Sequence, residues 1–173
     1  CRQEGGATYM AEAHGKLTGE PGVAMVTRGP GASNAFVGIH LAWQDSTPMV
    51  LFVGLIPFEH REKEAFQEFD PHQWFASGAK RVMVLDHAER ASEYVAEAMF
   101  AARSGRPGPV VVGLPEDVIT REIDATLHPE IPVAGGGMTV DDWKALEAAL
   151  QQSMKPLFCL LYTSDAADER SSV

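Results

Sequence analysis

The residues that first suggest chemistry form the turn Gly29-Pro30-Gly31, which ends an apolar run and precedes a helical pattern. Backbone N–H groups at the start of a helix can hold a polar or anionic ligand, and glycines let the main chain approach it closely. The spacing is neither the GxGxxG of a dinucleotide site nor a P-loop with its Lys and Ser or Thr. By spacing alone, the turn is either a ligand site or a structural turn.

Glu4 stands where another helical pattern begins. From its position alone, its carboxyl group is expected only to interact with the helix dipole. Arg103 and Arg106 could attract anions, but a solvated helix end is the expected place for both. The six histidines lack metal-ligand spacing and are expected at ordinary core or surface positions: His14, His40, His60, His72, His87 and His128.

Two cysteines lie at opposite ends of the chain, Cys1 and Cys159, so no disulfide framework is expected and a reducing compartment is favoured. The 14 basic and 24 acidic residues give a net charge of −10, which argues against nucleic acid or an anionic membrane as a partner. No apolar run approaches the ~20 residues of a membrane-spanning helix, and no signal sequence opens the chain. A cytoplasmic protein is expected.

Short apolar runs alternate with amphipathic stretches over most of the sequence. Helical periodicity predicts helices over residues 7–17, 32–43 and 91–102, and the second should be buried because it is apolar on most sides. Strands are predicted over residues 23–27, 49–53, 80–85 and 110–114. Continuous apolar strands separated by helices favour an α/β domain with three layers, α/β/α, and one mostly parallel sheet.

The pattern changes after this domain, for which we predict the range 1–118. The apolar period is lost over residues 116–137, and Gly135-Gly136-Gly137 marks a linker, predicted over 119–138. Thr139 and Asp142 predict a capping box for a helix that opens a truncated second domain, 139–157. Residues 155–161 suggest the start of a buried strand. Residues 158–173 are expected to be a non-native tail, similar to translated adapter sequence, and the chain is expected to be a fragment truncated at both ends.

Several sequence blocks occur in an order that resembles the N-terminal, pyrimidine-binding domain of thiamine diphosphate (TPP)-dependent enzymes. They lie at residues 2–7 (RQEGGA), 11–19, 27–34 (TRGPGASN), 44–48, 64–70 (EAFQEFD), 104–110 (SGRPGPV) and 114–118. The AFQE and SGRPGP blocks together are most similar to the acetolactate synthase large-subunit branch. Sulfoacetaldehyde acetyltransferases, oxalyl-CoA decarboxylases and benzoylformate decarboxylases share parts of the pattern.

The resemblance implies a catalytic role for Glu4. In the family, a glutamate hydrogen-bonds the pyrimidine nitrogen opposite the amine, which favours the tautomer that takes the proton from the thiazolium carbon. Gln3 stands where the family usually has His, and Gln can hydrogen-bond but cannot titrate.

The resemblance also implies that four further residues line the pyrimidine side of the cofactor: Thr27, Gly29, Pro30 and Asn34. For Asn34, an intrahelical or capping hydrogen bond is the alternative. Phe66 and Gln67 match a block that reaches toward the substrate across a dimer interface, with an ordinary pair of loop residues as the alternative.

Other implied features lie outside this chain. The family holds Mg²⁺ and the diphosphate through a Gly-Asp-Gly…Asn motif of a separate domain, which nothing here matches, so the metal ligands are expected elsewhere. The resemblance allows FAD in the full-length enzyme and implies a homodimer or homotetramer.

Three functions remain open. The first is a fragment of an acetolactate synthase-like enzyme that decarboxylates and condenses small 2-oxo acids. The second is a non-condensing 2-oxo acid decarboxylase or an acyl-CoA lyase of the same superfamily. The third is a non-catalytic dimerisation or ligand-binding module. The isolated chain is expected to be inactive and to bind thiamine diphosphate weakly.

Overall fold

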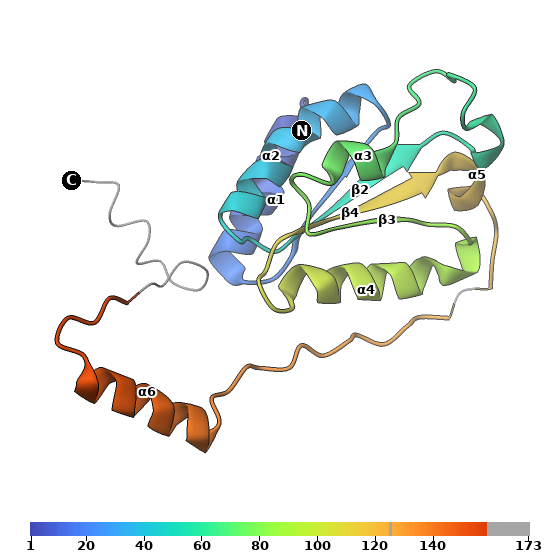
Figure 1. Ribbon diagram of the computed structural model, residues 1–173. Helices are drawn as coiled ribbons and strands as arrows, with labels where there is room; N and C mark the ends of the chain where they lie inside the picture. The colour runs from blue at the N-terminus through green and yellow to red at the C-terminus, as the bar shows by residue number, and fades with distance from the viewer. Residues whose placement is uncertain (125, 159–173) are drawn as a thin grey trace. The chain divides into compact units, whose positions relative to one another are not determined.

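The computed structural model describes residues 1–124 and 126–158 (Figure 1). The chain divides into two compact units, Cys1–Pro132 and Val133–Val173, which are described separately. The division falls inside the linker that the sequence predicts over residues 119–138. Within the described residues, no helix combines the length and the apolar character needed to cross a bilayer.

The first unit is built on one sheet of four parallel strands, in the order β1-β2-β4-β3. The predicted α/β class and single parallel sheet are therefore confirmed. The strands differ from their predicted bounds by one or two residues and are β1 (Gly22–Val26), β2 (Met49–Leu55), β3 (Arg81–Val84) and β4 (Pro109–Pro115).

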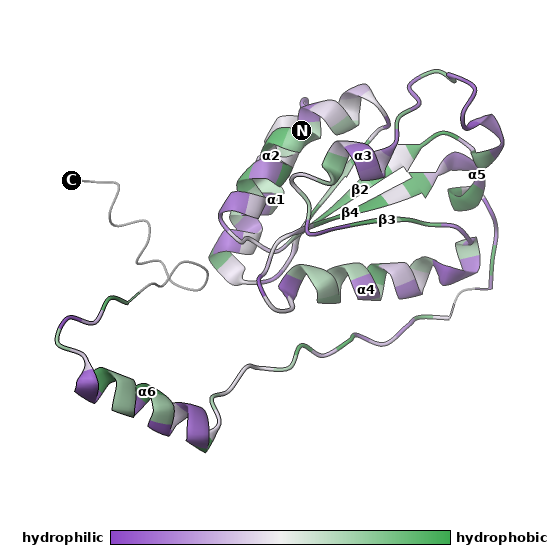
Figure 2. Cartoon of the chain, viewed as in Figure 1, coloured by the Kyte–Doolittle hydropathy of each residue, from purple (hydrophilic) through white to green (hydrophobic). Residues whose placement is uncertain are grey.

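Helices lie on both faces of this sheet, as predicted. One face carries α1 (Glu4–Thr18), α2 (Pro30–Gln44) and α3 (Pro71–Phe75), and the other carries α4 (Ala91–Arg103) (Figure 1). Because both faces of β2 and β4 are covered, these strands consist almost entirely of apolar residues, which Figure 2 shows largely in green. The strand β1 is covered on one face only, and Val23 and Met25 are exposed on the other. Burial of this apolar surface is the main term that stabilises the unit.

The helix α2 is buried on one side only. Ala32, Ala35, Ile39 and Ala42 are fully buried against the sheet and α1, whereas Val37 is 44% exposed. The prediction of a buried helix is therefore only partly correct. Its small alanine side chains form the inner surface, and the branched Val37 lies on the outer side.

The helices α1 and α2 approach each other closely at Gly38. A Cβ atom at this position would lie 2.4 Å from both Cβ and Oγ1 of Thr8, which is itself fully buried. The Thr8 hydroxyl donates to the backbone carbonyls of Glu4 and Gly5, at 3.2 and 3.1 Å. This contact fixes the first turn of α1 relative to α2.

The sequence did not predict the short helices. These are α3, α5 (Glu116–Ile119) and the 3₁₀ turns η1 (Phe58–His60) and η2 (Ala88–Arg90). The helix α5 buries Val118 inside the stretch 116–137, where the apolar period is lost. Helices this short show too few periodic residues to be detected.

The segment after α5 stays attached to α4. The His128 N–H donates to Ser92 Oγ at 2.6 Å, and Arg103 pairs with Glu130 at 2.6 Å and with Glu20 at 3.2 Å. Arg103 thus joins three segments rather than only ending a helix in solvent.

The second unit contains α6 (Val140–Gln152). The predicted capping box is confirmed, because Thr139 Oγ1 accepts from the Asp142 N–H while the Asp142 carboxylate accepts from Thr139. The predicted buried strand is wrong where it is described: residues 155–158 form no strand, and Leu157 is 91% exposed. Residues 159–173 lie outside the described residues.

Candidate functional site

The candidate site begins at the first turn of α1. Gln3 caps this helix, since its Oε1 accepts from the Gly6 N–H at 2.8 Å, and Glu4 follows as the first helical residue. Glu4 is half-buried, and a carboxylate in the first turn also interacts favourably with the helix dipole. The residue that replaces the family's usual His therefore has a clear structural role here.

Asn34 reaches Glu4 from the second turn of α2. Its Nδ2 donates to Glu4 Oε2 at 3.2 Å across 30 residues of sequence. This hydrogen bond joins the two helices, so the alternative of an intrahelical or capping bond for Asn34 is not what the structure shows. No described residue donates a hydrogen bond to the other carboxylate oxygen, Glu4 Oε1.

Gly31 lies between Glu4 and the end of β1. A Cβ atom at Gly31 would lie 2.7 Å from Thr27 Cγ2 and 3.5 Å from Glu4 Oε1. The lack of a side chain thus makes room for Thr27 and leaves the Glu4 carboxylate at the start of α2. The structure brings Glu4, Thr27 and Asn34 together around this glycine.

Gly29 connects this group to a distant loop. Its φ is +48°, in the left-handed region that favours glycine, and a Cβ atom here would lie 3.0 Å from both the Cβ and the carbonyl oxygen of Gln67. The glycine is therefore required by packing within the chain. The structure thus places Gln67 against Gly29 of the same chain, whereas the predicted approach of Gln67 to the substrate across a dimer interface stays a prediction.

Two further residues that the sequence singles out, Pro30 and Phe66, are exposed. Pro30 is exposed as the first residue of α2, where its missing N–H costs nothing. Phe66 is 81% exposed, and its side chain makes no described contact with Glu4.

Sequence reasoning singled out Phe66 and Gln67 in the loop over residues 61–68, but it missed the backbone conformation of this loop and the contacts of Glu68. Four described non-glycine residues have positive φ, and three of them lie here: Glu62 (60°), Glu64 (52°) and Gln67 (63°). Such conformations are strained, at about 1–3 kcal/mol each, and they cluster at functional sites.

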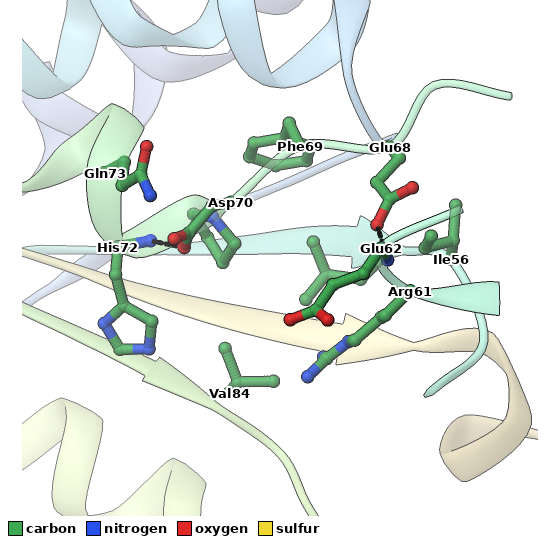
Figure 3. Close-up of a pocket in the computed structure, with 11 residues that line it drawn as sticks. Ile56, Arg61, Glu62, Glu68, Phe69, Asp70, His72, Gln73 and Val84 are labelled. Carbon is green, nitrogen blue, oxygen red and sulfur yellow. Dashed lines mark hydrogen bonds between the residues drawn. The ribbon is translucent and has the colours of Figure 1, made fainter. Parts of the chain in front are cut away.

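Glu68 holds this loop in place. Its carboxylate accepts from the Glu62 N–H at 2.6 Å (Figure 3). It also accepts from the Ala65 N–H at 2.9 Å. The bond from Glu62, followed by that from Ala65, lowers the pKa of Glu68 from the usual 4.5. Glu68 belongs to the AFQE block, but only its contacts reveal its role.

A cavity of about 440 Å³ lies beside this loop, at the carboxyl ends of β2 and β3. Arg61, Glu62, Glu68 and His72 are among its lining residues (Figure 3), and Glu4 is not. The cavity is thus separate from the group around Gly31. The described residues contain no cluster of three or more His, Cys, Asp or Glu placed to bind a metal ion.

The group around Gly31 presents a carboxylate beside a turn without side chains. Asn34 holds Oε2 of Glu4, and Oε1 can accept a hydrogen bond from a donor outside the chain. Gly29 and Gly31 keep the adjoining turn free of side chains. The described residues contain no comparable site for Mg²⁺.

Comparison with known proteins identifies the family of this chain. Residues 1–74 match the family "Thiamine pyrophosphate enzyme, N-terminal TPP binding domain". The acetolactate synthase large subunit of Lactococcus lactis is 41% identical over 131 residues, which cover 76% of this chain and 23% of the relative. The large subunit of acetolactate synthase isozyme 3 of Escherichia coli is 40% identical over 118 residues, covering 68% and 21%. The mitochondrial catalytic subunit of Saccharomyces cerevisiae is 41% identical over 117 residues, covering 68% and 17%.

The family match, the relatives and the parallel α/β fold define an N-terminal domain of the thiamine diphosphate-dependent enzymes. Within that family the chain belongs to the acetolactate synthase branch, as the sequence predicted. The chain spans less than a quarter of the length of these curated relatives.

Proposed function

We propose that this chain supplies the pyrimidine-binding half of the active site of an acetolactate synthase-like enzyme that acts on small 2-oxo acids. Thiamine diphosphate, when bound, provides the carbon nucleophile that such a reaction needs. The hydrogen bond between Glu4 and Asn34 at the start of two helices carries the proposal, because it holds one carboxylate oxygen and leaves the other for a ring nitrogen.

Each residue of the group has a distinct task. Glu4 Oε1 exchanges a proton with the pyrimidine nitrogen, and Asn34 Nδ2 holds Oε2. Gly29 and Gly31 keep side chains away from the ring edge, and Thr27 and Pro30 line it. A module that kept only the fold would not need a carboxylate there, which favours the enzyme over a non-catalytic dimerisation module.

The test uses a chimera, because the chain matches only part of its relatives. The aligned segment of the Lactococcus lactis large subunit is replaced by this chain, and acetolactate formation is measured together with deuterium exchange at the reactive cofactor carbon. Glu4→Gln should lower both rates by roughly 10²–10⁴-fold, as for loss of a general acid–base group. Cofactor affinity should fall only modestly.

Glu12→Gln is the matched control in the same helix. Glu12 is buried and accepts from Thr47 Oγ1 at 3.1 Å, a bond that a glutamine oxygen can still accept. This variant should keep both rates within a fewfold of the parent chimera. Equal exchange rates in Glu4→Gln and Glu12→Gln would refute the role of Glu4.

The remaining properties are part of the same proposal. A homodimer or homotetramer is supported by the exposed Phe66 and Val37, which leave apolar surface beside the site. Mg²⁺ and the diphosphate would be bound by residues beyond this chain, and FAD and a cytoplasmic location stay predictions. Sedimentation of the chain should show self-association, and calorimetry should show weak thiamine diphosphate binding.

A further inference from the structure

We infer that Glu68 is a positioning residue, whose carboxylate ties the loop 61–68 and thereby holds Gln67 against Gly29 at the mouth of the cofactor site. The inference rests on the proposed function for its consequence in catalysis. Its structural part rests on hydrogen bonds, backbone angles and close packing within this chain.

The first support is a four-residue turn whose first and last residues, Ala65 and Glu68, are joined by two hydrogen bonds. The Glu68 N–H donates to the Ala65 carbonyl at 2.9 Å, and the Glu68 carboxylate accepts from the Ala65 N–H at 2.9 Å. Gln67 is the third residue of this four-residue turn and has φ +63°. Turns with a positive φ at that position favour glycine or asparagine, so glutamine requires additional bonds to stay there.

The second support is that Glu68 also reaches the start of the loop. Its other oxygen accepts from the Glu62 N–H at 2.6 Å, and the guanidinium of Arg61 lies 3.8 Å from the centre of the Phe58 ring. One carboxylate therefore joins both ends of the strained segment, and η1 anchors its beginning.

The third support is the contact that this loop makes. The Cβ and carbonyl oxygen of Gln67 come within 3.0 Å, and its Cα within 3.3 Å, of the place where Gly29 would carry a side chain. Gly29 is followed by the first residues of α2, which lead to Asn34 and Glu4. A displacement of Gln67 would therefore remove the packing that holds the turn at Gly29 in place.

The structural part is tested on this chain by NMR. The N–H groups of Glu62 and Ala65 should be protected from hydrogen exchange, and nuclear Overhauser effects should connect Gly29 Hα with Gln67. Glu68→Gln should accelerate exchange at both amides by about tenfold or more and weaken the Gly29–Gln67 effects. Glu64→Gln removes the same charge from the same loop and should change exchange less than twofold.

Hydrogen exchange in the parent chain tests the inference even if Glu68→Gln fails to fold. Unprotected Glu62 and Ala65 amides in the parent would overturn it. Equal exchange in the two glutamine variants would also overturn it.

The functional part is tested in the chimera. Glu68→Gln should lower kcat/KM by about tenfold relative to Glu64→Gln, while cofactor binding stays within a fewfold. A released loop with unchanged kinetics would overturn the positioning role and leave the role of Glu4 intact. A protected loop in a chimera in which Glu4→Gln has no effect would overturn the proposed function, and the positioning role with it.

Discussion

The two sides of the candidate site are built in different ways. Glu4 and Asn34 stand on α1 and α2, whose relative position is fixed by the close contact of Gly38 with Thr8. Gln67 stands on an irregular loop, held by hydrogen bonds to one carboxylate. The helical side is stabilised by the core of the whole unit, whereas the loop side depends on a few local bonds.

This difference predicts how each side responds to change. Damage to the helical side must appear in the global free energy of unfolding, because the same residues pack the core. Damage to the loop side should open the loop locally and leave the sheet intact.

The largest effect is expected for Gly38→Ala on the helical side. The added Cβ would lie 2.4 Å from Thr8, which is fully buried and cannot move away. Overpacking should lower the free energy of unfolding by about 2–3 kcal/mol, more than the gain of about 1 kcal/mol in helix propensity. Chemical denaturation measures this change. Gly135→Ala, in open space, is the control and should leave the midpoint unchanged.

Gly29→Ala tests the contact between the two sides. Alanine at φ +48° costs about 1–2 kcal/mol, and the contact with Gln67 adds to this cost. Gly105 has a similar φ of +56° with no atoms within 4 Å of its missing Cβ. The unfolding free energy of Gly29→Ala should therefore be lower than that of Gly105→Ala, and Glu68→Gln should reduce the difference. Equal values would show that Gln67 does not press on Gly29 in solution.

Asn34→Asp tests the bond that orients Glu4. Aspartate has nearly the same shape but cannot donate to Glu4 Oε2 and repels it. Turnover of the chimera should fall by about tenfold, and further than in Asn34→Ala, which only removes the donor. The opposite order would indicate that Asn34 acts by its bulk and not by holding Glu4.

The helical side could be predicted from the sequence because its signals are local. Apolar runs separated by helical patterns predicted the parallel sheet, and the family resemblance singled out Glu4, Thr27, Gly29 and Asn34 as candidates. The pairing of Asn34 with Glu4 could not be predicted, because it joins residues 30 positions apart through the packing of two helices.

The loop side was not predictable for a physical reason. Left-handed backbone usually reveals itself by glycine or asparagine, and here it is adopted by Glu62, Glu64 and Gln67. The bonds that compensate for this strain come from Glu68, which in sequence is one of several acidic residues in a charged loop. The sequence therefore located Gln67 but not what holds it.

A smaller effect is expected at the cap of α1. Gln3→Ala removes the acceptor for the Gly6 N–H and should lower the unfolding free energy by about 0.5–1 kcal/mol. Gln3→His restores the commoner family residue and should be tolerated. Thermal unfolding of the two variants measures the difference, and an equal loss in both would mean that the Gly6 N–H needs a glutamine in particular.

The smallest effect on the whole unit is expected from acid, which should act on the loop side first. The bonds from Glu62 and Ala65 lower the pKa of Glu68 below 4.5, so the carboxylate is the favoured form in the folded chain. Its contribution to loop stability is complete above pH 4.5 and is lost as the pH falls through the lowered folded pKa. The amide shifts of Glu62 and Ala65 should therefore move together below pH 4.5, before the signals of the sheet change.

Glu68→Gln should abolish this transition, because it removes the carboxylate that accepts from both amides. Glu64→Gln should keep it, because Glu64 is exposed and these two amides donate to Glu68 instead. If the sheet signals changed at the same pH as these two amides, the loop would be part of the global cooperative unit, and the distinction between the two sides would be wrong.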